Sequence, residues 1–206
     1  MKTNIPIPEK FTAKEIRKVA FFGSADVLPE SKLYQEVFEI AQLIAKSGKV
    51  IVNGGGPGVM QAATKGAESV QGSSVAVTFQ PRDMTEFEGR DIENKVDLEY
   101  QTANYIERMF GLIYYADLFI CFKGGTGTLS EWATAWLMSH LYYGNHKPII
   151  LYGDFWYEIM DSISKHFFID EKEKDIYRIV TSQQELIEAI EQLELELTAR
   201  YRKSMG

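Results

Sequence analysis

Residues 118–131 read LFICFKGGTGTLSE and combine a short apolar run, a turn rich in glycine and the first residues of a helical period. A short run of bulky apolar side chains is typical of a buried strand. Glycine lets the backbone turn sharply and approach a ligand closely, and a helix that follows offers unpaired N–H groups to an anion. The stretch therefore predicts a strand, an anion-binding turn and a helix in succession.

The same succession extends along the chain, because short β-branched or aromatic runs alternate with longer stretches of helical period. We expect strands at 19–22, 50–53, 74–79, 96–100, 118–122, 149–152 and 178–180. We expect helices around 33–44, 58–70, 104–115, 128–141, 155–168 and 183–197. This order predicts an α/β fold with a doubly wound, mostly parallel sheet of about seven strands and helices on both faces.

The length of 206 residues suits one domain, so we expect a single domain over 1–206 with an N-terminal extension at 1–17 and a frayed tail at 198–206. The chain has 22 Lys and Arg against 29 Asp and Glu, a net charge of −7, which argues against general binding of nucleic acid or anionic membranes. No apolar stretch reaches the ~20 residues of a membrane helix, and the N-terminus does not resemble a secretory signal. We expect a cytoplasmic protein whose single cysteine, Cys121, belongs to the core.

Glycines cluster directly after three of the expected strands, where the chain turns toward a helix. Since the carboxyl ends of parallel strands meet at one edge of a sheet, these turns are expected to open onto a common rim. The alternative is that the glycines only permit tight turns. Lys123, at the entrance of the third turn, faces either the same anion or solvent. The three groups are Gly23-Ser24-Ala25, Gly54-Gly55-Gly56-Pro57-Gly58 and Gly124-Gly125-Thr126-Gly127-Thr128.

Several other chemistries are excluded by missing patterns. The P-loop motif is absent, which argues against a P-loop kinase or ATPase. A dinucleotide-binding fold would have G-x-G-x-x-G in the first turn and an acidic residue at the end of the second strand. Here the first turn has only Gly23 and the second strand ends at Asn53, which argues against dinucleotide binding. No serine-hydrolase G-x-S-x-G motif occurs. We expect no metal, because His140, His146 and His166 lack partners at a recognisable ligand spacing.

Two charged residues are candidates for chemistry at this rim. Glu131 lies one turn into the helix that the third glycine turn opens, where its carboxylate can face a bound group; the alternative is a capping box with Thr128. Arg108 lies near the start of a helix beyond the fourth strand, where a guanidinium can bind phosphate; the alternative is a surface pair with Glu107. Glu107 itself, three residues after Asn104, is expected to cap that helix.

The spacing G-G-G-x-G-[LV]-M, from Gly54 to Met60, precedes Arg108 and then G-G-x-G-T-x-x-E at 124–131. This pattern resembles the LONELY GUY (LOG) family of cytokinin-activating phosphoribohydrolases, over about residues 19–193. The resemblance implies a Rossmann-like nucleotide-binding domain, at least a homodimer and no cofactor. It also implies hydrolysis of the N-glycosidic bond of a nucleoside 5′-monophosphate to free base and ribose 5-phosphate.

The resemblance makes Arg108 and Glu131 the catalytic pair. The sequence departs from the family's pattern at two positions: Lys123 replaces a proline, and Met109 replaces a lysine after Arg108. The lost cation favours an alternative, a carrier that binds a nucleotide or a phosphorylated cofactor, as molybdenum cofactor carriers do, without cleaving it. The binding residues implied by the turns and the motif are Gly23, Ser24, Gly54, Gly55, Gly56, Gly58, Met60, Lys123, Gly124, Gly125, Thr126, Gly127 and Thr128.

Two further segments allow two interpretations each. The polar stretch 80–95 is either a lid or specificity segment beyond a strand, or a solvated loop. The aromatic-rich stretch that contains Trp132, Trp136 and Leu141 either covers a partner subunit or is buried under a neighbouring helix of the same chain. The family's dimers favour self-association.

Overall fold

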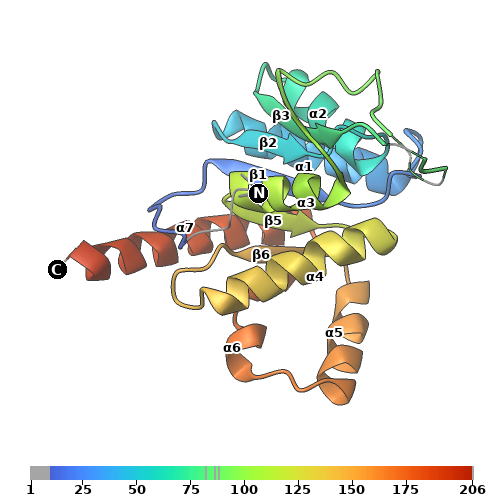
Figure 1. Ribbon diagram of the computed structural model, residues 1–206. Helices are drawn as coiled ribbons and strands as arrows, with labels where there is room; N and C mark the ends of the chain where they lie inside the picture. The colour runs from blue at the N-terminus through green and yellow to red at the C-terminus, as the bar shows by residue number, and fades with distance from the viewer. Residues whose placement is uncertain (1–9, 82, 86, 88, 206) are drawn as a thin grey trace.

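A seven-stranded, all-parallel sheet forms the centre of the protein in the computed structural model, which describes residues 10–81, 83–85, 87 and 89–205 (Figure 1). The strand order is β4-β3-β2-β1-β5-β6-β7. The strands are β1 (Lys18–Phe22), β2 (Val50–Asn53), β3 (Ser74–Phe79), β4 (Leu98–Thr102), β5 (Leu118–Cys121), β6 (Ile149–Tyr152) and β7 (Tyr177–Val180). The helices are α1 (Lys32–Lys46), α2 (Val59–Glu68), α3 (Tyr105–Tyr115), α4 (Thr126–Leu141), α5 (Phe155–His166), α6 (Glu171–Lys174) and α7 (Gln183–Met205).

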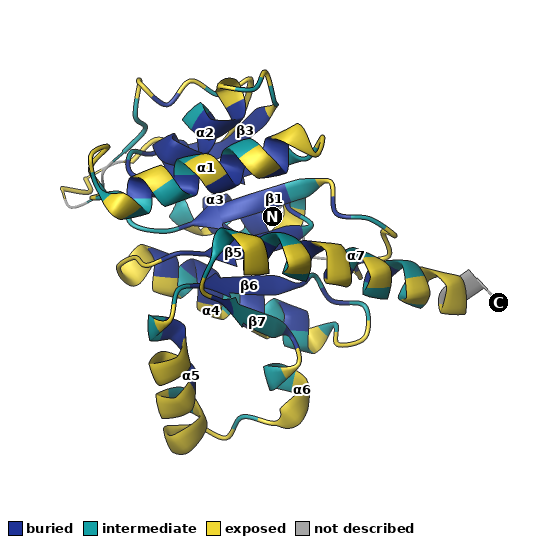
Figure 2. Cartoon of the chain, turned by 180° about the vertical axis from the view of Figure 1, so that it is seen from behind, coloured by how far each residue is buried: buried dark blue, intermediate teal, exposed yellow. Residues whose placement is uncertain are grey.

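Helices cover both faces of the sheet, and the alternation of side chains along each strand supplies both cores. In β1, Val19 and Phe21 belong to the core under α1, α2 and α7, whereas Ala20 and Phe22 belong to the core under α3, α4 and α5. Figure 2 shows α1 and α7 on the side opposite to α3 and α4. Because the central strands are buried on both faces, they read as continuous apolar runs, and the predicted α/β fold is confirmed.

Three elements differ most from the expectations. β4 begins at Leu98, two residues later than expected, and an exposed edge strand shows no burial pattern from which its start could be predicted. The residue before it, Asp97, accepts a hydrogen bond at its carboxylate from the backbone N–H of Ser74 at 2.7 Å. α6 was not expected, since its four residues are too few to show a period. α7 continues through the expected frayed tail to Met205, and the Thr198 hydroxyl donates to the backbone carbonyl of Lys14 at 3.2 Å.

The two tryptophans of the aromatic-rich stretch on α4 are buried within the same chain, whereas Leu141 is exposed. Trp132 and Trp136 stack with ring centroids 5.4 Å apart, and Trp156 of α5 lies 5.0 Å from Trp132. The indole N–H of Trp136 donates to the backbone carbonyl of Glu173 in α6 at 2.9 Å. These two tryptophans are therefore part of the core, and the interpretation that they cover a partner subunit is wrong.

Among the described helices, none has the length and hydropathy to cross a bilayer.

A buried histidine makes the stability of the fold depend on pH. His146, in the turn before β6, is 4% exposed, accepts at Nδ1 from the N–H of Gly144 at 3.2 Å and stacks on Tyr143. Burial is the main cause that lowers its pKa from 6.5 to about 4; the positive charge of Arg200 adds to this, while Glu196 and Asp175 oppose it. The folded protein thus binds this proton more weakly than the unfolded chain does.

We therefore expect stability to be lost as the pH falls from 6.5 toward 4, because the unfolded chain then takes up the proton first. The loss attributable to His146 amounts to at most about 3 kcal/mol. Urea unfolding of the wild type and of His146→Asn at several pH values measures it. The variant, which cannot take up this proton, should lose less stability than the wild type over this range. If the free energy of unfolding fell equally with pH in both proteins, His146 would not be the cause of the loss.

Candidate functional site

The first and third glycine turns meet at the carboxyl edge of the sheet, because β1 pairs directly with β5. The N–H of Ser24 donates to the carbonyl of Lys123 at 3.1 Å, and the N–H of Val59, the first residue of α2, donates to the carbonyl of Ser24 at 3.0 Å. A cavity of about 450 Å³ opens at this junction. It is lined by Gly23, Ser24, Ala25, Asp26, Thr85, Phe87, Gly125, Thr126, Gly127 and Thr128.

A smaller cavity of about 40 Å³ adjoins the large one and contains both candidate catalytic residues. The two cavities share Gly23, Gly127 and Thr128. The small cavity is also lined by Phe21, Gly54, Met60, Tyr105, Arg108 and Glu131. The predicted catalytic pair is therefore adjacent to the N-terminus of α4, where backbone N–H groups and the helix dipole favour an anion.

Arg108 of α3 is a buried cation, 3% exposed. Its Nη1 lies 3.3 Å from Oε1 of Glu131, and its Nη2 lies 3.6 Å from the sulfur of Met60. Its Nε is buried and has no hydrogen-bond partner among the described residues. The guanidinium carbon lies 5.6 Å from the ring centroid of Tyr105. A buried guanidinium with an unused donor can bind an anionic or polar group.

The alternative interpretation, that Arg108 forms a surface ion pair with Glu107, is wrong. Glu107 caps α3: its N–H donates to the Asn104 side chain at 2.9 Å, and its carboxylate accepts from the N–H of Ala103 at 3.1 Å. The next residue, Met109, is also buried, and its sulfur accepts from the hydroxyls of Ser130 and Thr134 of α4 at 3.3 and 3.5 Å. Met109 thus contributes to the packing between α3 and α4.

Glu131 does not cap α4. The helix begins at Thr126, after Gly125 as N-cap, so Thr128 is already inside the first turn and the alternative of a capping box with Thr128 is wrong. Glu131 is 7% exposed and faces Arg108. Its negative charge adds to burial in raising the pKa of the fully buried Cys121 thiol well above its ordinary value. Cys121 is therefore a core residue, as predicted, and the site is a low-dielectric environment for the carboxylate of Glu131.

The glycine turns have different structural roles. A Cβ at Gly54 would lie 1.7 Å from Nη2 of Arg108, so only glycine leaves room for the guanidinium. A Cβ at Gly125 would meet nothing within 4 Å. The second turn thus packs against the protein's own atoms. In the third turn Gly125 is open, whereas a Cβ at Gly124 would lie 2.1 Å from the Thr128 hydroxyl. Among the predicted binding residues, those that line neither cavity are Gly55, Gly56, Gly58, Lys123 and Gly124.

Six lining residues were not among the predicted site residues: Phe21, Ala25, Asp26, Thr85, Phe87 and Tyr105. Thr85 and Phe87 belong to the polar segment 80–95, which the sequence marked as either a specificity segment or a solvated loop. An aromatic residue inside a polar loop was the available signal for Phe87. Lys123 is exposed, and its ammonium lies 5.9 Å from the ring centroid of Phe155.

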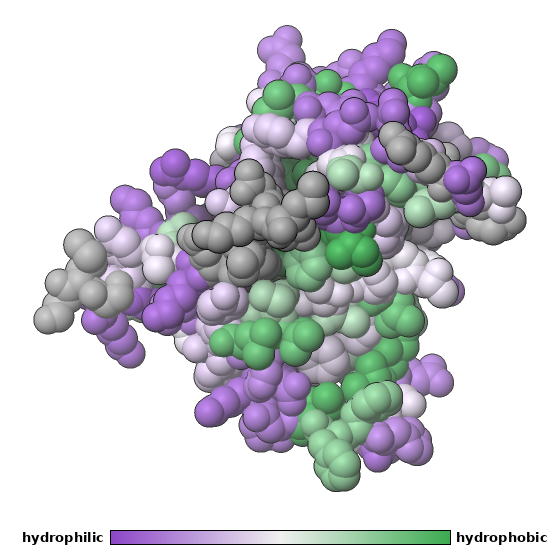
Figure 3. Space-filling model, in the orientation of Figure 1, coloured by the Kyte–Doolittle hydropathy of each residue, from purple (hydrophilic) through white to green (hydrophobic). Residues whose placement is uncertain are grey.

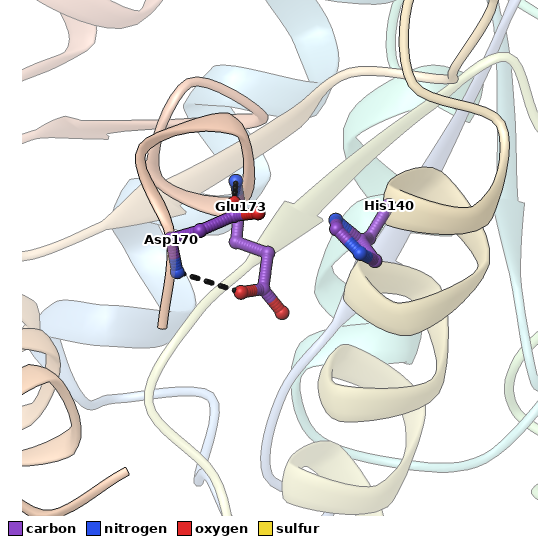
Figure 4. Close-up of side chains that lie close together, drawn as sticks. All are labelled: His140, Asp170 and Glu173. Atoms are coloured by element: carbon purple, nitrogen blue, oxygen red, sulfur yellow. Dashed lines mark hydrogen bonds between the residues drawn. The ribbon is translucent and has the colours of Figure 1, made fainter. Parts of the chain in front are cut away.

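One group of potential metal ligands occurs among the described residues, at the other end of α4 (Figure 4). His140, Asp170 and Glu173 place one ligand atom each within 4.8 Å of the others. Asp170 and Glu173, however, already form the capping box of α6, with hydrogen bonds of 2.9 and 2.8 Å. Helix capping accounts for these two carboxylates, and we assign them no metal.

The contact between Gly54 and Arg108 leads to a test of stability. Gly54→Ala must displace the buried guanidinium, and we expect a loss of about 1–3 kcal/mol in the free energy of unfolding. The matched control is Gly127→Ala in the first turn of α4, where the added Cβ makes an ordinary contact of 3.4 Å with the Tyr105 hydroxyl. Urea unfolding compares the two. The interpretation is wrong if Gly54→Ala is as stable as Gly127→Ala.

The chain is similar in sequence and in fold to known proteins. A protein of Archaeoglobus fulgidus is 31% identical over 139 residues, which cover 68% of this chain and 86% of that protein. The molybdenum cofactor binding protein of Rippkaea orientalis superposes with a TM-score of 0.62 at 25% identity, covering 88% of this chain and 98% of that one. The molybdenum cofactor carrier protein of Chlamydomonas reinhardtii superposes with a TM-score of 0.63 at 21% identity, covering 87% and 98%.

The family model described as the SLOG cluster4 family matches residues 16–188. These residues include all three glycine turns, Arg108 and Glu131. The match supports the LONELY GUY resemblance at the level of the LOG-like superfamily. The chain belongs to the SLOG cluster4 family.

Proposed function

We propose that the protein hydrolyses the N-glycosidic bond of a nucleoside 5′-monophosphate, releasing the free base and ribose 5-phosphate. The observation that carries this proposal is the buried pair of Glu131 and Arg108, 3.3 Å apart, directly beside an open helix N-terminus. A buried carboxylate paired with a buried cation is costly to maintain for structure alone. Buried charged groups in a cavity are typical of functional sites.

The phosphate is bound in this proposal by the third glycine turn. Gly125 and Gly127 leave the backbone accessible, and Thr126 and Thr128 add hydroxyl groups beside the N-terminus of α4. Binding of the 5′-phosphate at this point supplies energy remote from the bond that breaks, and it holds C1′ of the ribose within reach of Glu131. The net charge of −7 does not oppose this, because the N–H groups act locally.

The reaction follows the charge pattern of glycosidic cleavage, in which the sugar becomes an oxocarbenium-like cation. The bond between C1′ and the base nitrogen breaks with its electron pair leaving on the base, which takes up a proton from solvent; Glu131 afterwards returns to solvent the proton that it accepts in the next step. A water oxygen bonds to C1′ and gives its proton to Glu131. The carboxylate stabilises the cationic sugar before it accepts that proton, and Arg108 holds the nucleotide and the carboxylate in position.

Loss of the carboxylate charge tests this assignment. Glu131→Gln should reduce base release from AMP or another monophosphate about a hundred- to ten-thousand-fold, because the general base is lost. Chromatography of the products over a panel of monophosphates and ribosides measures the rate. Glu107→Gln, a change in the cap of the neighbouring helix, is the control and should keep the wild-type rate. Equal rates for wild type and Glu131→Gln would refute the role of Glu131.

The second candidate is a carrier that binds a phosphorylated cofactor without cleaving it. Two observations favour it: Met109 replaces the cation of the family's Arg-Lys pair, and the similar protein of Rippkaea orientalis is described as binding the molybdenum cofactor. Calorimetric binding of a monophosphate with no base released over hours would decide for the carrier. Release of base by the wild type at catalytic rates would decide for the hydrolase.

We also propose that the chain self-associates through α3 and α4. Apolar side chains on these helices are exposed, including Leu137 at 56% and Tyr114 at 45%, and Figure 3 shows hydrophobic residues gathered on this side of the molecule. Exposed apolar groups of this kind are typical of protein interfaces. The remaining exposed apolar residues of the two helices are Ile106, Leu129 and Leu141.

The expected state is a dimer that Leu137→Glu converts to a monomer, because a buried, unpaired carboxylate is costly at an interface. Light scattering coupled to size-exclusion chromatography measures the mass. The matched control is Leu195→Glu on α7, where the leucine is 67% exposed on the opposite face of the sheet. Self-association through α3 and α4 is excluded if Leu137→Glu and the wild type have the same mass.

A further inference from the structure

Among the described residues, three hydrogen bonds attach the loop between β3 and β4 to the second glycine turn. The backbone N–H of Asp91 and the guanidinium of Arg90 donate to the carbonyl of Gly55 at 3.0 and 3.1 Å. The side-chain amide of the fully buried Asn94 donates to the carbonyl of Gly56 at 2.7 Å. The loop is therefore held against the turn that packs on the guanidinium of Arg108. Its described residues are thus fixed beside the site.

Phe87, from the same loop, is part of an aromatic cluster. Its ring centroid lies 4.7 Å from that of the buried Phe79 and 6.2 Å from that of Tyr105, and the Arg108 guanidinium carbon lies 5.9 Å from it. The ring is half-buried and lines the large cavity together with Thr85. The cluster orients Phe87 before any ligand binds, so that binding costs little side-chain entropy.

The other residues that line the large cavity are small or polar. Apart from Phe87, its described lining consists of glycine, serine, alanine, aspartate and threonine. A long apolar ligand would find one aromatic wall and would remove the polar groups of the other lining residues from water, which is costly. A planar heteroaromatic ring suits this lining better, because its face is apolar and its edge carries hydrogen-bonding groups that Asp26, Thr85 and Thr126 can satisfy.

The size of the cavity agrees with such a ligand. A volume of about 450 Å³ lies within the range of small-molecule sites and exceeds what a phosphate and a pentose fill. We propose that Phe87 is the wall on which a planar heteroaromatic group of the ligand stacks, so that the site selects a nucleotide-like phosphate ester over a plain sugar phosphate. This inference rests on the phosphate site of the proposed function and adds the determinant of specificity.

Two probes separate the ring from the phosphate. Formycin A 5′-monophosphate is an AMP analogue whose base is joined to the sugar by a carbon–carbon bond, so it binds without hydrolysis, and ribose 5-phosphate lacks the base. Calorimetry should give the wild type at least about tenfold higher affinity for the analogue. Phe87→Leu should weaken binding of the analogue about 5- to 100-fold, since stacking on an aromatic side chain is lost, and leave binding of ribose 5-phosphate unchanged.

Two control variants separate stacking from structure. Phe87→Tyr keeps the aromatic face and should keep the preference for the analogue. Phe79→Leu perturbs the same aromatic cluster at a buried ring that does not line the cavity, and it should reduce the preference less than Phe87→Leu does, because the stacking ring of Phe87 is still present. Binding of ribose 5-phosphate to each variant shows that the phosphate site is folded. A preference lost equally in Phe79→Leu and Phe87→Leu would overturn the proposal.

The outcomes distinguish this inference from the proposed function. Equal affinity of the wild type for both probes, or equal weakening of both by Phe87→Leu, would overturn the stacking wall and leave the phosphate site intact. Binding of the analogue with the expected preference, but no base released from AMP, would support the stacking wall and contradict hydrolysis. If the wild type bound neither probe, the phosphate site would be refuted and the inference with it.

Discussion

The guanidinium of Arg108 lies so close to the backbone of Gly54 that any side chain there would occupy its place. A cation that is 3% exposed is costly unless its surroundings compensate it, and Glu131, Tyr105 and the sulfur of Met60 do so. These groups come from α2, α3, α4 and the turn after β2. Their mutual positions depend on β2, β1 and β5 being neighbours in the sheet. The site is therefore a consequence of the strand order.

Glycine has two separate functions at this edge. In the second turn it makes room for the protein's own side chains, as at Gly54, and in the third turn it leaves the backbone open, as at Gly125. A glycine-rich sequence has the same appearance in both cases. Only the neighbours that a Cβ would meet tell them apart, and they divide the predicted phosphate-binding glycines into those packed against the protein's own atoms and those whose backbone is open to a ligand.

The fold was predictable because strands buried on both faces appear as apolar runs, and the helices between them keep a visible period. The prediction was less accurate where this burial is missing. The edge strand β4 is exposed and was placed two residues early, and the four residues of α6 show no period. Charged residues at 200–203 suggested a frayed tail, but α7 continues through them to Met205.

For the candidate site, the sequence by itself determined the α/β fold, the three glycine turns and the two charged candidates, Arg108 and Glu131, because these depend on local pattern and spacing. Only the tertiary structure decided that Arg108 pairs with Glu131 and not with Glu107, and that Phe87 lines the cavity. The two charged residues are separated by 23 positions in the chain. Their contact depends on the packing of α3 against α4, and burial of both charges follows from that packing and from no local pattern.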